Sequence, residues 1–314
     1  MKLRFLIRPV LLSLLIPGLQ TCLGAQDMNP TKEMRPPQFS YSSEESSTRT
    51  PQLAQKESDL RAALAAQPDS ADLLYALGLV LRQEGKPRES LDTYTRAARY
   101  RKPASAELRS VAIDYVLLND YEDAIHWLEL AVGTNPTDAD TLYALGRCYY
   151  SKDRYVDAGR MFARVLELEP KHLKAEENLG LVYDATNRPD KSEEALRAAA
   201  GWANPNGTDE WPFLDLGNFL LEQNRAQEAI APLRIAVRIQ PVRATSHEKL
   251  GRALLATKDT AEGITELEAA ARLEPKDPKT HYELGRALRQ AGLTERAQEE
   301  FGLSQKLYSA HSQE

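Results

Sequence analysis

A pair formed by an apolar residue and a small one recurs along the chain at an almost constant interval. The pair is Leu-Gly in six places and Val-Ala in one, and successive pairs lie 34, 34, 34, 37, 34 and 34 residues apart. A fixed period of this length is the signature of stacked repeats, because each unit can bury its apolar face only against its neighbours. The second members of the pairs are Gly78, Ala112, Gly146, Gly180, Gly217, Gly251 and Gly285.

Each repeat is predicted to contain two antiparallel helices. In the third repeat one group of apolar and small residues follows the i, i+3, i+4, i+7 spacing of a helix face, and a second group follows i, i+4, i+7. A short polar stretch, 151–154, separates the groups, and most other repeats have Gly or Asn at the corresponding turn, which suits a helix end. The two groups are Leu142, Leu145, Gly146 and Tyr149, then Ala158, Phe162 and Val165.

The recurrent glycine is unfavourable inside a helix by about 1 kcal/mol relative to alanine. We expect it to be kept because the absence of a Cβ lets the two helices of a repeat approach closely. Burial of one large apolar side chain contributes roughly 1.5–3 kcal/mol, which can offset that loss.

Further residues stand at fixed distances from the pair. A small residue follows twelve positions later, a large one four beyond it, and a proline closes six of the seven copies. This pattern resembles the tetratricopeptide repeat, W-x₂-L-G-x₂-Y…A-x₃-F…P with a period of 34 residues. The resemblance implies an all-α, right-handed solenoid of about seven helix pairs, with residues 52–70 as an N-terminal capping helix. The expected repeats are 71–104, 105–138, 139–172, 173–209, 210–243, 244–277 and 278–311.

The first 25 residues have the layout of a secretory signal peptide. Lys2, Arg4 and Arg8 precede an apolar run over 10–19, and small residues end at Ala25. The run is about half of the roughly 20 residues that a membrane-spanning helix needs. We therefore expect an exported protein, periplasmic or secreted, that is cleaved near Ala25. Lipidation at Cys22 is the alternative, although the usual small residue does not precede it.

Residues 26–51 are rich in Pro, Ser and Glu and poor in apolar residues, so we predict a disordered linker. The net charge of the chain is −6, and no basic run alternates with aromatic residues, so nucleic acid is not an expected partner. Cys148 would be the single cysteine after removal of the leader, and we expect it to be a buried apolar side chain.

The chain carries no pattern typical of an enzyme. It has no phosphate loop, no Gly-x-Ser-x-Gly and no His-Glu-x-x-His. His247 and His281 share one repeat position, and we expect them to fill a core slot that other repeats give to leucine, with Glu248 and Glu283 facing outward. The sequence thus predicts no catalysis, no cofactor and no metal site.

The resemblance implies that ligands bind the concave surface formed by the first helices of the pairs. Some family members also clamp a C-terminal carboxylate, but only Asn178 of that clamp has a counterpart here, so the clamp is not reproduced. Tyr, Trp and Arg dominate interface energetics, and several lie at the implied positions. The implied binding residues are Tyr75, Arg82, Arg109, Tyr143, Arg147, Tyr150, Lys174, Trp211, Asn218, Arg252, Tyr282, Arg286 and Arg289. Acidic residues at implied positions of the same surface are Asp72, Asp140, Glu177, Asp184, Glu222 and Glu248.

These features predict a protein–protein interaction scaffold that binds peptides or partner subunits and has no transmembrane span in its mature form. A second hypothesis is an assembly factor of a cell-envelope complex, such as pilus, secretion or outer-membrane machinery, which could be a lipoprotein through Cys22. A third, an enzyme or a sugar- or metal-binding protein that uses the same surface, has no positive support in the sequence.

Overall fold

The computed structural model describes residues 50–311, and every regular element in that range is an α-helix. The predicted signal peptide and almost all of the predicted linker lie outside the described residues. The fifteen helices are α1 (Pro51–Ala66), α2 (Ala71–Gln83), α3 (Pro87–Ala97), α4 (Ser105–Leu117), α5 (Tyr121–Thr134), α6 (Ala139–Ser151), α7 (Tyr155–Leu168), α8 (Leu173–Ala185), α9 (Pro189–Trp202), α10 (Trp211–Glu222), α11 (Ala226–Ile239), α12 (Ala244–Ala256), α13 (Thr260–Leu273), α14 (Pro278–Gln290) and α15 (Thr294–His311).

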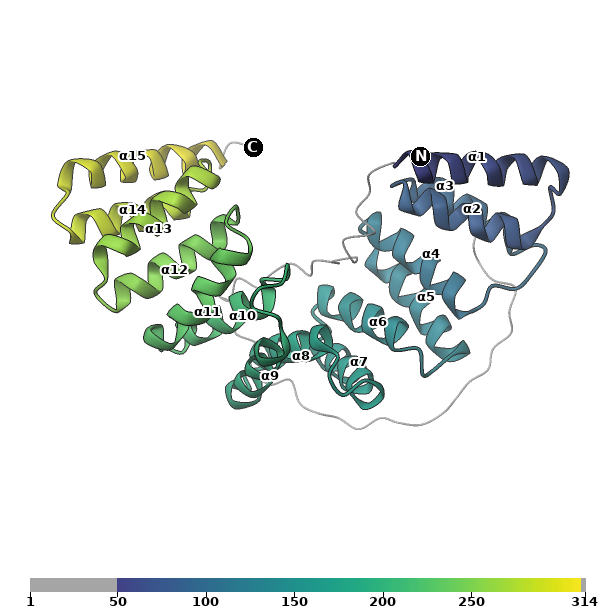
Figure 1. The fold of residues 1–314 in the computed structure, drawn as a ribbon, viewed down its shortest axis with the longest axis horizontal. Helices are drawn as coiled ribbons and strands as arrows, with labels where there is room; N and C mark the ends of the chain where they lie inside the picture. The colour runs from purple at the N-terminus through teal and green to yellow at the C-terminus, as the bar shows by residue number, and fades with distance from the viewer. Residues whose placement is uncertain (1–49, 312–314) are drawn as a thin grey trace.

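The helices form consecutive hairpins from α2–α3 to α14–α15, and the hairpins stack into an open arch with α1 at one end and α15 at the other (Figure 1). This confirms the predicted all-α repeat architecture. First helices of neighbouring repeats contact one another, as α2 does with α4 and α10 with α12. They therefore lie on the inner side of the arch, and the second helices form its outer side.

The recurrent glycines lie directly against the large residue of the second helix. A Cβ atom built on Gly78 would meet Tyr94 at 2.8 Å, and one built on Gly217 would meet Leu233 at 2.5 Å. Real Cβ atoms do not approach other atoms this closely. These contacts show the expected steric reason for the glycine. The large residue of the second helix fills the volume that a Cβ atom would occupy.

The turn inside each repeat requires a left-handed backbone at one residue. Six of the seven are types that tolerate positive φ, among them Gly85 (φ 74°), Asn119 (φ 58°) and Asp153 (φ 57°). The exception is Lys258, at φ 70° in the sixth repeat. Each of these residues ends the first helix and reverses the chain into the second.

In the first, third and fifth repeats, the loop that enters the repeat is fastened by an arginine of the second helix. Arg96 donates a hydrogen bond to the carbonyl of Pro68 (2.6 Å), and Arg164 donates to that of Pro136 (2.7 Å). Arg238 makes the equivalent contact with Pro205 (3.0 Å). These bonds satisfy carbonyl groups that no helix ladder can reach.

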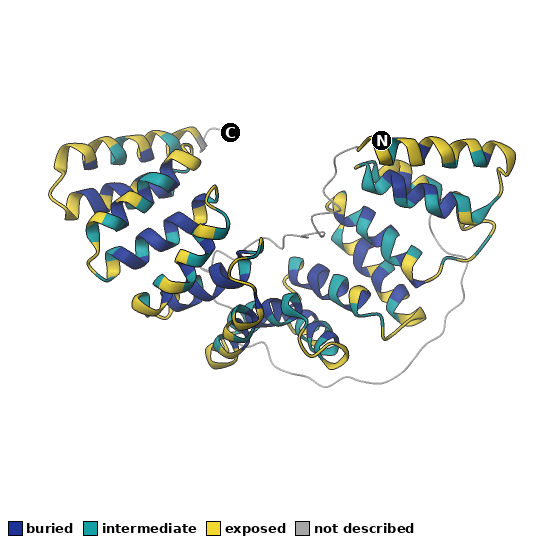
Figure 2. Ribbon diagram, in the orientation of Figure 1, coloured by how far each residue is buried: buried dark blue, intermediate teal, exposed yellow. Residues whose placement is uncertain are grey.

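The two ends of the arch are more exposed than its middle (Figure 2). Helix α1 begins at Pro51, one residue before the predicted start, and covers the first repeat with Leu64. Its Glu57 accepts hydrogen bonds from Arg61 (2.7 Å) and from Lys86 (3.0 Å), which lies just before α3. Burial alone would raise the pKa of Glu57, but the two cations outweigh it and hold the pKa at about 2.

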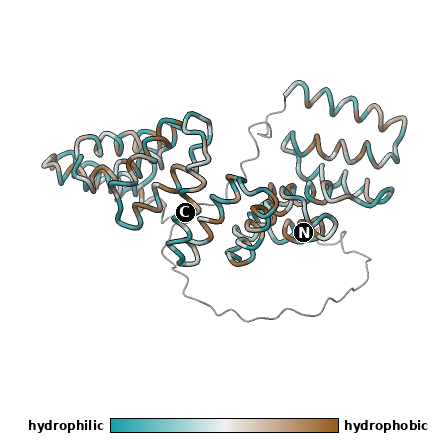
Figure 3. The backbone as a smooth tube through the Cα atoms, turned by 60° about the horizontal axis from the view of Figure 1, so that its bottom comes forward, coloured by the Kyte–Doolittle hydropathy of each residue, from teal (hydrophilic) through white to brown (hydrophobic). Residues whose placement is uncertain are grey.

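The core runs along the arch between helices rather than at one centre. Hydrophobic and hydrophilic segments alternate along the helices (Figure 3), as expected for amphipathic helices that each bury one face. Cys148 lies fully buried in the α4–α8 part of this core, and burial raises the pKa of its thiol to about 12. A thiol in this setting is a packing group and not a nucleophile.

Candidate functional site

The concave surface of the arch divides into three stretches, and the thirteen implied binding residues are distributed over all of them. Those on α2 and α4 are mainly structural. Tyr150, Trp211 and Asn218 line a central hollow, and Arg252, Arg286 and Arg289 line a second hollow nearer the C-terminus. Their degree of burial decides which of them a partner could reach.

Tyr75 is buried and holds a loop rather than facing solvent. Its hydroxyl donates to the carbonyl of Arg101 (2.7 Å), and the Arg101 guanidinium lies 4.4 Å above its ring. Burial raises the pKa of Tyr75 to about 12. Arg109, on α4, is committed to Asp138 (3.1 Å) and Asp140 (3.0 Å) at the start of the next repeat. This end of the concave surface is therefore used largely for contacts between repeats.

A buried carboxyl group lies behind the same stretch. Asp114 is fully buried, and its Oδ2 lies 2.6 Å from the hydroxyl of Ser90, which also contacts the carbonyl of Gly78 at 2.8 Å. Burial raises the pKa of Asp114 to about 7, although Ser90 and the charge of Arg82 favour ionisation. A hydroxyl has one hydrogen, so both contacts are satisfied when Asp114 is protonated and donates to Ser90.

Tyr143 joins two first helices in the centre of the arch. Its hydroxyl accepts hydrogen bonds from Arg147 (3.1 Å), one turn along α6, and from Asn178 (3.3 Å) on α8. Arg147 is only 3% exposed, so it is part of the wall and not a free guanidinium. The structure brings these three residues together, whereas the clamp of the resembling family would need a different set around Asn178.

The central hollow has a volume of about 600 Å³ and is bounded by α6, α8, α10, α12 and the start of α14. Trp211 lies at its edge with the Arg243 guanidinium 4.2 Å above its ring, and Asn218 donates to Glu222 (2.9 Å). Tyr150 also borders it but is buried against Tyr155. Six carboxylates and three cations border the hollow, so its charge is negative; the carboxylates are Asp184, Asp215, Glu222, Glu248, Glu274 and Asp277.

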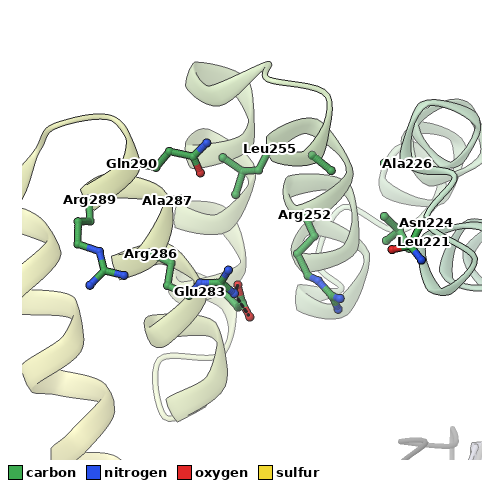
Figure 4. A pocket seen from close by; sticks show the side chains of 11 residues that line it. Leu221, Asn224, Ala226, Arg252, Leu255, Glu283, Arg286, Ala287, Arg289 and Gln290 are labelled. Carbon is green, nitrogen blue, oxygen red and sulfur yellow. Dashed lines mark hydrogen bonds and ion pairs between the residues drawn. The ribbon is translucent and has the colours of Figure 1, made fainter.

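The C-terminal hollow, of about 660 Å³, has the opposite charge. It lies between α10, α12 and α14 and is bordered by Arg252, Arg286 and Arg289, with Glu283 as its one carboxylate (Figure 4). Apolar side chains complete it, namely Leu221, Ala226, Leu255, Ala256 and Ala287, together with the polar Asn224 and Gln290. Tyr282 lies nearby on α14, 48% exposed and packed on Phe301.

Lys174, at the start of α8, is half-buried, and its carbonyl accepts a hydrogen bond from Asn178 (2.7 Å). Lys249 is a residue of the central hollow that sequence reasoning missed. Burial lowers the pKa of its ammonium group. The sequence did not mark Lys249 as a site residue, because polar residues such as Asn178 and Asp215 stand at the same position in other repeats.

The two histidines of the shared repeat position are buried, and each lies in contact with a glutamate of the second helix. His247 Nδ1 lies 2.6 Å from Glu266, and His281 Nδ1 lies 2.7 Å from Glu300. The Nε2 atom of His247 meets the carbonyl of Pro241 (3.0 Å), and that of His281 meets the carbonyl of Pro275. Each histidine thus bridges its second helix and the loop that enters its repeat.

The expectation that Glu248 faces outward is wrong. Glu248 is 7% exposed, and its Oε1 accepts no hydrogen bond, although Arg252 lies 3.6 Å and Lys279 3.9 Å from it. Glu248 instead lines the central hollow, together with Lys279 at the start of α14. Glu283, one repeat later, is half-buried and pairs with Arg286 (3.2 Å).

Within residues 50–311, no three His, Cys, Asp or Glu side chains are grouped so that they could hold a metal ion. No helix of this described part is long and apolar enough to cross a membrane.

Comparison with known families and structures agrees with the geometry. A sequence model described as tetratricopeptide repeat matches residues 57–109, 112–164 and 248–304, more than half of the chain. A second model of the same description matches residues 177–206. No curated protein matches the chain by sequence.

Solved structures share the fold at low identity. PilF of Pseudomonas aeruginosa is similar with a TM-score of 0.58 and 18% identity, over 67% of this chain and 94% of that one. PilW, described as a widely conserved type IV pilus biogenesis factor, gives 0.56 and 18%, over 62% and 90%. YrrB, described as a protein with an unusual peptide-binding site, gives 0.50 and 18%, over 59% and 94%. Identities this low establish a common fold and nothing about shared partners.

Proposed function

The chain belongs to the tetratricopeptide repeat family, a scaffold for protein interactions, and we propose that its concave surface binds extended segments of partner proteins. The observation that carries this proposal is the pair of hollows. Both lie on consecutive first helices, and each combines apolar side chains with charged or aromatic groups. Sites of this composition can bury apolar side chains of a guest while a few polar groups fix its orientation.

The residues available to a partner are fewer than the sequence implied. Tyr75, Arg147 and Tyr150 are buried, so they shape the concave surface but are not accessible to a partner. The more accessible set is Asn218 and Trp211 at the central hollow, Arg252, Arg286 and Arg289 at the C-terminal hollow, and Tyr282 nearby on α14.

Site-specific photocrosslinking in cells tests the proposal. A benzophenone amino acid placed at Asn218 or Tyr282 lies on the inner side of the arch, whereas the same group at the exposed Arg160 of α7 or Thr265 of α13 lies on second helices. We expect one or a few proteins to be captured from the inner positions only. Equal capture from both sides, identified by mass spectrometry, would contradict a concave binding surface.

A second candidate is a part in the assembly of a cell-envelope complex. It is favoured by the predicted leader over residues 1–25 and by the layout of leader, linker and repeats. The shared fold with PilF and PilW is consistent with it. Mass spectrometry of the mature N-terminus and cell fractionation test this candidate: a mature chain that begins near Gln26 supports export and removes the lipoprotein form, whereas an uncleaved cytoplasmic protein contradicts both.

A further inference from the structure

The C-terminal hollow has an excess of positive charge that the protein itself does not neutralise. Arg286 pairs with the half-buried Glu283, three residues earlier on α14 (3.2 Å), and Arg252 lies 3.6 Å from Glu248. Among the described residues, Arg289 has no carboxylate within ion-pair distance; its guanidinium carbon lies 5.3 Å from the centre of the Phe301 ring. Stacking on an aromatic ring restricts the side chain while leaving its donors accessible.

The three guanidinium groups come from two neighbouring first helices and border one hollow (Figure 4). Arginine presents planar donor groups that match a carboxylate in a two-pronged contact. Leu221 and Leu255 border the same hollow, so a guest could bury an apolar side chain beside its carboxylates. This combination fits an acidic segment with interspersed leucine-type residues.

The central hollow provides the contrast. Its six carboxylates and three cations repel an acidic segment, although it shares α10, α12 and α14 with the C-terminal hollow and is of similar size. The charge of the concave surface therefore changes sign along α12 and α14, from negative at their N-terminal ends to positive at their C-terminal ends. An acidic guest has one favourable place on this surface, and its register is set by the charges as well as by shape.

From this geometry we infer that the C-terminal hollow binds an acidic, leucine-containing segment of a partner protein, through carboxylates on Arg286 and Arg289 with support from Arg252. The inference rests on the proposed concave binding surface and specifies the charge of the guest and its place. It differs from the carboxylate clamp considered above, since it uses arginines of α12 and α14 and does not involve Asn178.

Fluorescence anisotropy with short labelled peptides tests the inference on the full repeat array. The probe alternates glutamate, leucine and serine; matched probes replace every glutamate by glutamine or by lysine. We expect the acidic probe to bind about tenfold more tightly than the neutral one, from several exposed charge contacts that each contribute modestly. Raising the salt from about 0.1 M to about 1 M, which shortens the Debye length from about 10 Å to about 3 Å, should remove most of that difference.

The decisive variant is Arg286→Gln with Arg289→Gln. We expect it to lose about tenfold in affinity for the acidic probe and little for the neutral one. The matched control is Arg99→Gln with Arg160→Gln, two exposed arginines on the second-helix side, which should bind as the unmodified protein does. Circular dichroism melting shows whether each variant is folded.

Each outcome decides a separate point. Equal binding of the acidic probe by both double variants would overturn the assignment to this hollow. Tighter binding of the lysine probe than of the acidic one would overturn the charge of the guest. If no probe binds while concave photocrosslinks are still obtained, the acidic assignment fails and the concave binding surface stands.

Discussion

Gly146 faces Phe162 so closely that a methyl group on its Cα would come within 2.7 Å of the Cε1 atom of the ring. Phe162 is fully buried, so the ring has no room to withdraw. The second repeat shows how the contact changes with composition: there Ala112 stands at the glycine position and Leu128 at the aromatic one, and both are buried. In the fifth repeat, by contrast, a Cβ on Gly217 would meet Leu233 at 2.5 Å, so a leucine alone does not make room for the methyl group.

We expect Gly146→Ala to destabilise the protein by roughly 1–2 kcal/mol, because overpacking costs more than the helix propensity of alanine returns. Phe162→Ala should reduce the cost of the alanine at position 146, because it removes the ring that the added methyl group meets. Urea denaturation of the two single variants and the double variant gives the coupling. Gly302→Ala in α15 is the control, since nothing lies within 4 Å of its added methyl group and it should stabilise. Additive effects at Gly146 and Phe162 would contradict the steric account.

Lys258 is the one long side chain among the left-handed turn residues, at φ 70°. Lys258→Gly should stabilise the protein by about 0.5–1 kcal/mol, because glycine adopts this conformation without a steric penalty. The reciprocal change Gly292→Lys, at φ 79° in the next repeat, should destabilise by a similar amount. Thermal melting of both variants checks the pair; loss of stability on Lys258→Gly would show that the lysine side chain makes a contact worth more than the strain.

Asp114 should make stability depend on pH around neutrality. Its pKa in the folded chain, about 7, lies above the roughly 3.9 of an unfolded aspartate, so the folded state binds the extra proton. Its contribution to stability is complete below about pH 4 and is lost as the pH rises through 7. Asp114→Asn retains a donor toward Ser90 and carries no charge. It should stabilise by roughly 4 kcal/mol at pH 8, from about 3 pKa units at about 1.4 kcal/mol each, and by little at pH 4, measured by urea denaturation at both pH values. An equal effect at the two values would contradict a protonated Asp114.

His247 should titrate above the usual histidine range. The hydrogen bond to Glu266 raises its pKa most, burial opposes this, and the carbonyl of Pro241 adds to the increase. The stability that it contributes is therefore complete below about pH 6.5 and is lost as the pH rises through the raised pKa. Glu266→Gln should bring the pKa down, followed by NMR of the ring Cε1 proton. Glu268→Gln, whose glutamate pairs with Arg296 instead, is the control and should leave His247 unchanged.

The periodicity was sufficient to predict the hairpins, since Gly146 and Phe162 stand at a fixed separation that one helix–turn–helix satisfies. It was also sufficient to place His247 in the core. It could not give Glu266 as the partner of His247, because that contact depends on the angle at which the second helix crosses the first. The burial of Arg147 and of Glu248 could not be predicted either. Spacing shows on which face of a helix a residue lies, but not how far neighbouring elements cover that face.

The bonds from Arg96 to Pro68 and from Arg164 to Pro136 join the second helix of a repeat to the loop in front of its own first helix. A repeat with this bond, as the fifth also is through Arg238 and Pro205, therefore holds its own entry loop without help from the preceding repeat. Shortened arrays that start at such a proline retain the bond, whereas arrays that start at the first helical residue leave the arginine without its acceptor. The structural boundary of such a repeat therefore lies at the proline before its first helix, and not at the first helical residue.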